Sequence, residues 1–405
     1  MVLKNKNMIS QRVLNLEESA TLAMSAKSTA LKQEGKDVIN LSIGEPDFDT
    51  PAFIKEEAIK AINENFTHYT AVPGIMELRK AICKKLLRDN GVEYKPEQIV
   101  VSTGAKQAIA NVLLALVDPG DEVVIACPYW VSYSELVKLA EGTPVLVKAG
   151  IEHDFKITAD QLEAAITPKT KLIMLNSPCN PTGSVYDKNE LEALAKVVEK
   201  HENVFVLSDE IYEHIIFKGK HECFAQFESI KDRVIIINGV SKGFAMTGWR
   251  LGFSASIQPI AKACSKLQGQ ITSGTTSIAQ KAAVVAFNAD PKEMPEMKIM
   301  VAKFKERRNL LLGLLNDIPG VKTNIPDGAF YVFPDVTYFY GKSDGKTTIK
   351  DGKDLCMYIL DNVFVACVPG VAFGNPNCIR LSYATSNENL IEAARRIKSV
   401  LANLK

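Results

Sequence analysis

The sequence lacks an excess of charge of either sign. Its 48 lysines and arginines stand against 47 aspartates and glutamates, which leaves a formal net charge of +1 and no charged tail. Proteins that bind nucleic acid or an anionic membrane surface carry a marked excess of basic residues. The near balance therefore argues against nucleic acid and membrane as partners of this chain.

Long apolar runs are also missing. No stretch approaches the roughly 18 apolar residues that cross a bilayer, and no apolar stretch follows Lys4 and Lys6 near the start. A membrane span and a secretory leader both need such a stretch. The sequence therefore predicts a cytoplasmic protein.

Closely spaced cysteine pairs, which would indicate a metal site, do not occur. The eight cysteines are scattered through mostly apolar surroundings, at Cys83, Cys127, Cys179, Cys223, Cys264, Cys356, Cys367 and Cys378. This distribution is typical of reduced, buried thiols. We expect no bound metal.

The composition that remains is that of an ordinary globular protein. Hydrophobic residues make up 46% of the chain and charged residues 23%, which excludes wholesale disorder. A length of 405 residues corresponds to two or three domains of about 150 residues each.

Short β-branched runs alternate with amphipathic helical windows between about residues 100 and 255. The runs are Ile99–Ser102, Val123–Cys127, Val145–Val147, Leu172–Asn176, Val204–Ser208, Val234–Asn238 and Leu251–Ala255. This order is typical of a mostly parallel sheet covered by helices.

Helix starts support this interpretation. The segments that begin at Thr158 and Asp187 have the capping-box pattern. Thr50 ahead of Pro51 predicts another cap, before a helix over 53–63.

The pattern changes after about residue 300. A charged helix over 303–315 and a strand-rich stretch at 329–333 precede a final helix, whose apolar face carries Leu390, Ala393, Ile397, Val400 and Leu404. The sequence thus predicts an α/β fold: a large domain over 48–300 with a mostly parallel, helix-flanked sheet, and a smaller α+β domain over 301–405. Residues 1–47 form an N-terminal arm and part of the small domain.

Polar segments follow four of the predicted strands. They are Ser102-Thr103-Gly104-Ala105, Asn180-Pro181-Thr182-Gly183, Asp209-Glu210-Ile211-Tyr212 and Ser241-Lys242-Gly243. In an α/β sheet, ligands bind beyond the carboxyl ends of the strands. These segments therefore offer an anion site at a helix start, an amide, a carboxylate and a lysine.

Each segment also has a purely structural interpretation. Thr103 as an ordinary helix cap is the simpler explanation of the first segment alone. That segment lacks the glycine patterns of nucleotide and dinucleotide loops, which disfavours ATP and NAD. Asp209 suits a cap, a metal ligand or a partner for a protonated ring nitrogen. Its neighbour Glu210 should face the other side of the strand. Lys242 is either solvated or a lysine that forms a Schiff base.

In their order along the chain, these segments resemble the class I/II pyridoxal-phosphate-dependent aminotransferases of fold type I. The motifs that carry the resemblance are Gly44-Glu45-Pro46-Asp47-Phe48, the asparagine, aspartate and lysine segments above, Met246-Thr247-Gly248-Trp249-Arg250 and Asn377-Cys378-Ile379-Arg380. The match runs from about residue 10 to the end. Pro128-Tyr129-Trp130-Val131-Ser132-Tyr133 is most similar to the bacterial aspartate aminotransferase subgroup.

The resemblance implies pyridoxal 5'-phosphate as cofactor, bound in the large domain. Lys242 would form the Schiff base and carry the proton, and Asp209 would hold the ring nitrogen protonated. Asn180 and Tyr212 would bond the phenolate oxygen, and Trp130 would stack on the ring. The phosphate would be held by Gly104, Ala105, Ser241 and Arg250, together with Tyr69 from the neighbouring subunit. The resemblance thus implies a homodimer with shared active sites.

The substrate residues are implied in the same way. Arg380 would bind the α-carboxylate beside Gly44, Trp130 and Asn180, and Lys106 would meet a distal carboxylate. The implied reaction is transamination between aspartate and 2-oxoglutarate, giving oxaloacetate and glutamate.

Other activities of this fold stay open. They are an aromatic, prephenate or alanine-type aminotransferase, a synthase acting on an amino acid, and a carbon–sulfur lyase. A non-catalytic regulator that binds the cofactor is disfavoured, because only about 40 residues precede Gly44, too few for a DNA-binding domain.

Overall fold

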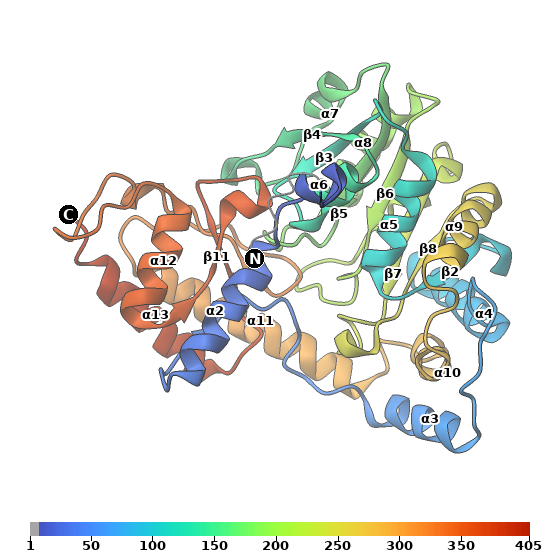
Figure 1. Ribbon diagram of the computed structural model, residues 1–405, viewed down its shortest axis with the longest axis horizontal. Helices are drawn as coiled ribbons and strands as arrows, with labels where there is room; N and C mark the ends of the chain where they lie inside the picture. Colours follow the sequence, from blue (N-terminus) through green and yellow to red (C-terminus); the bar gives the residue numbers. More distant parts are fainter. Residues whose placement is uncertain (1–7) are drawn as a thin grey trace.

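A seven-stranded sheet forms the centre of the computed structural model, which describes residues 8–405 (Figure 1). Lys4 and Lys6 lie outside the described residues. The strand order is β2-β8-β7-β6-β5-β3-β4. The bounds are β2 (Ile99–Ser102), β3 (Glu122–Cys127), β4 (Thr143–Lys148), β5 (Thr170–Asn176), β6 (Phe205–Asp209), β7 (Val234–Gly239) and β8 (Gly252–Ala255). Only β8 runs antiparallel to its neighbours in this sheet, so the predicted mostly parallel sheet is confirmed.

Helices cover both faces of this sheet. Leu172 and Met174 of β5 enter one core, and Ile173 and Leu175 enter the other, as expected for a parallel sheet buried on both sides. The first core includes residues of α5 (Ala105–Leu116), α6 (Ser132–Leu139) and α9 (Gln258–Ile271). The second includes residues of α3 (Ala52–Asn63), α4 (Met76–Lys85), α7 (Ala159–Ala165), α8 (Lys188–Glu199) and α10 (Ser277–Asn288).

A smaller unit of helices and short strands lies beside the sheet domain, where Figure 1 shows the orange and red segments. Its strands are β1 (Ile39–Asn40) paired with β10 (Val365–Ala366), and the antiparallel set β11 (Val368–Pro369), β12 (Ile379–Ser382) and β9 (Tyr331–Val332). Its helices are α2 (Ala20–Gln33), α11 (Pro295–Asn316), α12 (Gly352–Val363) and α13 (Asn387–Leu401). The predicted domain boundary at 300 lies inside α11, and the domain bounds stay a prediction.

The predicted capping boxes at Thr158 and Asp187 are confirmed, since each side chain accepts a hydrogen bond from the backbone three residues on. The prediction that Thr50 caps the next helix was wrong. Helix α3 begins at Ala52 after Pro51. The Thr50 hydroxyl instead donates to Ala245 O and accepts from Trp249 Nε1, because the chain beyond Lys242 packs against it.

All eight cysteines are free thiols, and all except the half-buried Cys83 are buried. Among the helices of residues 8–405, none combines the length and apolar character that crossing a membrane requires.

Candidate active site

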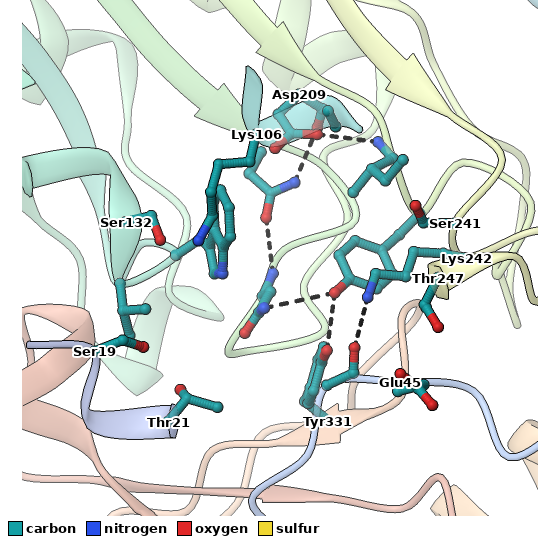
Figure 2. Close-up of a pocket in the computed structure, with 18 of the residues that line it drawn as sticks. Ser19, Thr21, Glu45, Lys106, Ser132, Asp209, Ser241, Lys242, Thr247 and Tyr331 are labelled. Carbon is teal, nitrogen blue, oxygen red and sulfur yellow. Dashed lines mark hydrogen bonds between the residues drawn. The ribbon is translucent and has the colours of Figure 1, made fainter. Parts of the chain in front are cut away.

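A pocket of about 360 Å³ lies where the carboxyl ends of β5, β6 and β7 face the smaller unit (Figure 2). The sheet side of its wall includes Asp209 at the end of β6 and Lys242 beyond β7. Tyr331 of β9, Arg380 of β12 and Thr21 of α2 line it from the smaller unit. The site therefore needs both parts of the chain.

Nearly all of the predicted site residues line this one pocket. They are Gly44, Ala105, Lys106, Trp130, Asn180, Asp209, Tyr212, Ser241, Lys242, Arg250 and Arg380. Gly104 stands just behind Arg250, because a Cβ at Gly104 would lie 2.6 Å from Arg250 Nη2. Tyr69 does not line the pocket and is 99% exposed. The sequence predicts that Tyr69 reaches the active site of a neighbouring subunit instead.

Lys242, whose side chain is partly buried, presents its amine to the pocket. Its Nζ donates a hydrogen bond of 2.5 Å to Gly44 O. Burial, aided by the nearby charges of Arg380 and Arg250, lowers the pKa of Lys242 to about 8, while the charges of Glu45 and Asp209 oppose the shift. A substantial fraction of this amine is therefore neutral near pH 8, as a nucleophile or base requires.

Asp209 is buried but well bonded. Tyr133 Oη donates a 2.6 Å hydrogen bond to its Oδ2, and the Ile211 backbone N–H donates to its Oδ1. Burial raises the pKa of Asp209 to about 6, against the opposing effect of these two hydrogen bonds. The carboxylate is thus mostly ionised at neutral pH. Sequence reasoning missed Tyr133 as the partner, since the short helix α6 gives no sign of which strand end its tyrosine meets.

Arg380 lies fully buried at the opposite wall. Its Nη1 donates to Asn180 Oδ1 at 2.9 Å and its Nη2 to Ser42 O at 2.6 Å. Its guanidinium also packs 4.6 Å from the ring centroid of Tyr331. Within residues 8–405, Arg380 Nε has no hydrogen-bond partner. A buried cation with an unused donor favours an anionic ligand.

Two tyrosines close the same wall. The hydroxyls of Tyr212 and Tyr331 lie 2.8 Å apart, and Asn180 Nδ2 reaches Tyr212 Oη at 3.5 Å. A Cβ at Gly44 would lie 2.7 Å from Tyr331 Oη, so only glycine fits where the chain passes this hydroxyl. The role of Tyr331 was missed. The sequence indicated a strand there, but not that the strand faces this pocket.

Lys106 and Arg250 form a cationic corner at the N-terminus of α5. Lys106 Nζ lies 4.9 Å from the Trp130 ring centroid. Burial lowers the pKa of Lys106, and the charge of Arg250 lowers it further. Gly104, with φ of +81°, caps the helix, whose first N–H groups and dipole also attract anions. This corner suits a phosphate or a carboxylate.

Comparison with known proteins decides the family. Residues 36–397 match the profile of the family described as aminotransferase class I and II. The chain belongs to this family. The predicted resemblance is thereby confirmed, and the chain is an aminotransferase.

Curated relatives cover almost the whole chain. It is 48% identical to the bifunctional aspartate aminotransferase and glutamate/aspartate-prephenate aminotransferase of Petunia hybrida, over 98% of this chain and 83% of that protein. It is 46% identical to the aspartate/prephenate aminotransferase of Nitrosomonas europaea, over 97% of this chain and 100% of that protein.

Solved structures of aminotransferases superpose closely on this one. The aspartate aminotransferase from Rhizobium meliloti gives a TM-score of 0.94 at 43% identity, covering 98% of this chain and 99% of that chain. The aspartate aminotransferase from Thermus thermophilus with maleate gives 0.91 at 39% identity, covering 97% and 99%. The predicted fold class is confirmed by these structures.

The pH dependence of Lys242 reactivity is the first prediction. In the full-length protein without ligands, acylation of Lys242 by a small amine-selective reagent should rise with pH, reach half its maximal rate near pH 8 and level off above about pH 9, since the neutral amine reacts. A lysine in water titrates near about 10.4. Mass spectrometry of the peptide that carries residue 242 measures the rate. A rate that keeps rising tenfold per pH unit from about 8.5 to about 10 would contradict the lowered pKa.

Proposed function

We propose that this aminotransferase transfers the amino group of aspartate to 2-oxoglutarate, giving oxaloacetate and glutamate, with pyridoxal 5'-phosphate as cofactor. One observation carries the proposal: a partly buried lysine with a lowered pKa lies in a pocket that also offers a buried carboxylate and separate cationic groups. The names of the relatives support aspartate as the amino donor.

The pocket residues fit the cofactor. The amine of Lys242 suits its aldehyde, and the ionised Asp209 suits a protonated ring nitrogen. The cradle at Gly104, which a Cβ would fill, suits the phosphate together with Ser241 and Arg250. When bound, pyridoxal phosphate supplies an electron sink for the negative charge that develops at the substrate α-carbon.

Further residues complete the cofactor's surroundings in this proposal. Asn180 and Tyr212, linked to each other, would bond the phenolate oxygen, and Trp130 would cover the ring. Asp209 keeps its ionised form because Tyr133 donates to it, and an ionised carboxylate favours the protonated form of a nitrogen beside it.

The protein's part in the reaction is to bind, orient and move a proton. Arg380 binds the α-carboxylate of the substrate through its guanidinium edge, whose Nε is free within the described residues, while Asn180 holds the guanidinium in place. The neutral amine of Lys242 takes the proton from the substrate α-carbon. The same amine, once protonated, returns a proton in the second half of the transfer.

Lys106 gives the preference for a dicarboxylic substrate. Once Arg380 holds the α-carboxylate, a second carboxylate needs another cation, and Lys106 stands in the same pocket beside Trp130. The neighbouring structure from Thermus thermophilus was determined with maleate, a dicarboxylate. Prephenate, which also carries two carboxylates, is the second candidate substrate because relatives are named for it.

The proposal includes a homodimer with shared sites. Tyr69 lies fully exposed and away from the pocket of its own chain. The N-terminal arm also exposes apolar side chains, at Met8, Ile9, Val13 and Leu14. A second copy would cover these groups and receive Tyr69 at its phosphate corner. The cytoplasmic location stays a prediction from the sequence.

Transamination by the protein loaded with pyridoxal phosphate tests the activity. Aspartate and 2-oxoglutarate should give oxaloacetate and glutamate in equal amounts, and Lys242→Ala should abolish turnover because covalent attachment of the cofactor and proton transfer both need its amine. A panel with prephenate, alanine, phenylalanine and a thioether amino acid ranks the alternatives. Pyruvate release without transamination would identify a carbon–sulfur lyase instead.

Lys106→Ala tests the substrate preference. A charge-assisted contact contributes about 1.5–3 kcal/mol, so kcat/KM for aspartate should fall roughly ten- to a hundredfold, with little change for alanine or phenylalanine. Lys106→Met, which keeps an unbranched side chain beside Trp130, should give the same selective loss. Equal losses on acidic and neutral substrates would overturn the assignment.

Mixed dimers test the shared site. Tyr69→Ala and Lys242→Ala homodimers should both be impaired. Co-expression should restore activity, because a site with Lys242 from one chain and Tyr69 from the other regains both wild-type residues. A mixture no more active than the sum of its parents would place Tyr69 outside the partner's site.

A further inference from the structure

A buried network of charged side chains lies around the turn that follows Asp209. It centres on Glu213, whose side chain is 3% exposed, and Lys85, whose side chain is 1% exposed. The Lys85 ammonium forms a short ion pair with Glu213 Oε1 and donates to Asn90 Oδ1 at 2.6 Å. Asn90 in turn donates to Glu213 Oε2 at 2.9 Å.

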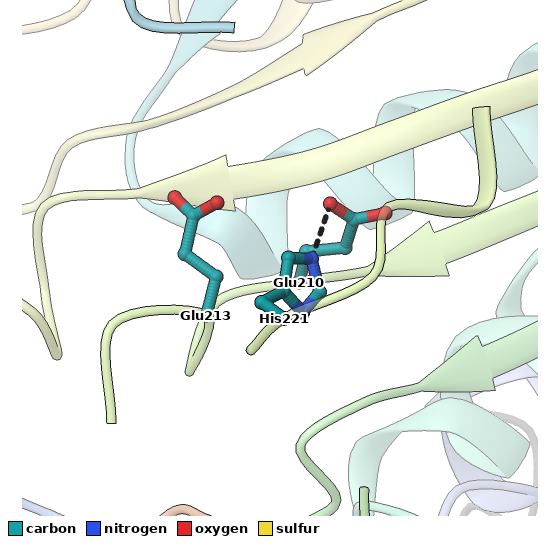
Figure 3. A group of neighbouring side chains, drawn as sticks. All are labelled: Glu210, Glu213 and His221. Carbon is teal, nitrogen blue, oxygen red and sulfur yellow. Dashed lines mark hydrogen bonds and ion pairs between the residues drawn. The ribbon is translucent and has the colours of Figure 1, made fainter. Parts of the chain in front are cut away.

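Glu213, Glu210 and His221 lie close enough to one another to suggest a metal site, and Figure 3 shows the three side chains. Their ligand atoms, however, already have partners. His221 Nε2 is 2.8 Å from Glu210 Oε2, and the Lys85 ammonium already neutralises Glu213. The cluster is therefore better explained as a network that holds neighbouring segments in place than as a metal site.

Glu213 connects two strand ends that carry the active-site groups. Asn238, near the end of β7, donates from Nδ2 to Glu213 Oε1 at 2.7 Å. The Asn238 Oδ1 accepts from the Gly239 N–H, so the amide is fixed at both ends. Glu213 follows Tyr212 directly, and Asn238 precedes Lys242 by four residues. One buried carboxylate thus joins the turn after β6 to the segment after β7.

Backbone pairing does not make this connection. The bond from Glu210 N to Ile237 O extends the β6–β7 pairing one step beyond Asp209. Within residues 8–405, no further backbone hydrogen bond joins the turn after β6 to the segment after β7. His214 then packs on the far segment, since a Cβ at Gly243 would lie 2.7 Å from His214 Cδ2. Glu213 and His214 therefore hold the turn against the residues on both sides of Lys242.

The charge on this carboxylate is kept by its surroundings. Burial alone would raise the pKa of Glu213, but Lys85 beside it holds the pKa well below its ordinary value. A buried ion pair contributes little net stability compared with apolar residues of the same size. Stability alone therefore does not explain this pair, and the contacts that Glu213 makes with neighbouring segments are the feature to consider.

We propose that Glu213 is a positioning residue of the active site, whose carboxylate fixes the turn that follows Asp209 and bears Tyr212 relative to Lys242. The proposal rests on the function proposed above, in which Asp209 and Tyr212 would bind the cofactor and Lys242 would move the substrate proton. Lys85 is the counter-ion that stabilises the charged form of Glu213 at this buried position.

Two double variants separate positioning from stability. Lys85→Met with Glu213→Gln and Lys85→Met with Glu213→Leu both remove the ion pair, but only the glutamine keeps an oxygen that accepts from Asn238. The glutamine variant should keep kcat for aspartate within about threefold of wild type. The leucine variant should lose about a hundredfold in kcat with little change in KM, because a shift of about 1 Å has such an effect.

A second readout needs neither cofactor nor turnover. The pH at which acylation of Lys242 reaches half its maximal rate should rise from about 8 towards about 9 in the leucine variant, since a loosened turn admits water to the amine. It should stay near the wild-type value in the glutamine variant. Circular dichroism and thermal melting establish that both variants fold.

Asn238→Ala removes the other end of the same hydrogen bond and leaves the ion pair intact, so it serves if the leucine variant does not fold. It should show the same loss in kcat. Glu210→Gln is the matched control, because within residues 8–405 the hydrogen-bond partners of this equally buried carboxylate, Ser208, His221 and Phe224, all lie between β6 and β7 or in β6 itself and none is in the segment that bears Lys242. It should stay within about threefold of wild type.

The outcomes distinguish this inference from the proposed function. Full kcat and an unchanged acylation profile in the leucine variant, or an equal loss in the glutamine or Glu210→Gln variants, would overturn the role of Glu213. A wild-type protein without transaminase activity would overturn the proposed function instead, and the acylation profiles would still report on the position of Lys242.

Discussion

Parallel pairing of β5, β6 and β7 places the carboxyl ends of these three strands side by side, with Asn176 opposite Asp209 and Asp209 opposite Ile237. Everything at the candidate site depends on this register. A slip of one residue would turn Asp209 to the other face, because side chains alternate along a strand. The pairing also leaves the segments beyond each strand free to carry Asn180, Tyr212 and Lys242 to the same pocket.

Burial then sets the pKa values of the side chains that this register brings together. Removal from water disfavours charge, so it raises the pKa of Asp209 to about 6 and lowers that of Lys242 to about 8. Between these values both groups are mostly charged. The carboxylate loses its charge as the pH falls through about 6, and the amine loses its charge as the pH rises through about 8.

The pocket holds more positive than negative groups. Lys106, Arg250, Lys242 and Arg380 line it, against the carboxylates of Glu45 and Asp209. Desolvated cations of this kind favour anionic ligands, and their separation over opposite walls suits a ligand with more than one anionic group. An amino acid with two carboxylates and a phosphorylated cofactor have that character.

Local patterns in the sequence were enough to predict the seven strands, the two capping boxes and the polar segments at the strand ends. Each of these depends on residues near one another in the chain. The resemblance to the family added predicted roles for Lys242, Asp209 and Arg380, because periodicity alone does not distinguish such residues from solvated or structural ones. Tyr69 and the dimer it implies stay predictions, since a single chain does not show its partner.

Tertiary packing decided the remainder. Thr50 meets Trp249 and Ala245 instead of capping its helix, because segments 195 residues apart come together there. Tyr133 bonds to Asp209, Tyr331 to Tyr212, and Glu213 to Lys85 and Asn238, across separations that range from 25 to 128 residues. The sequence by itself determined which side chains would stand at the strand ends. Which distant groups would bond to them was decided only by the folded chain, because hydrogen-bond partners of buried polar groups are set by proximity in space and leave no local pattern.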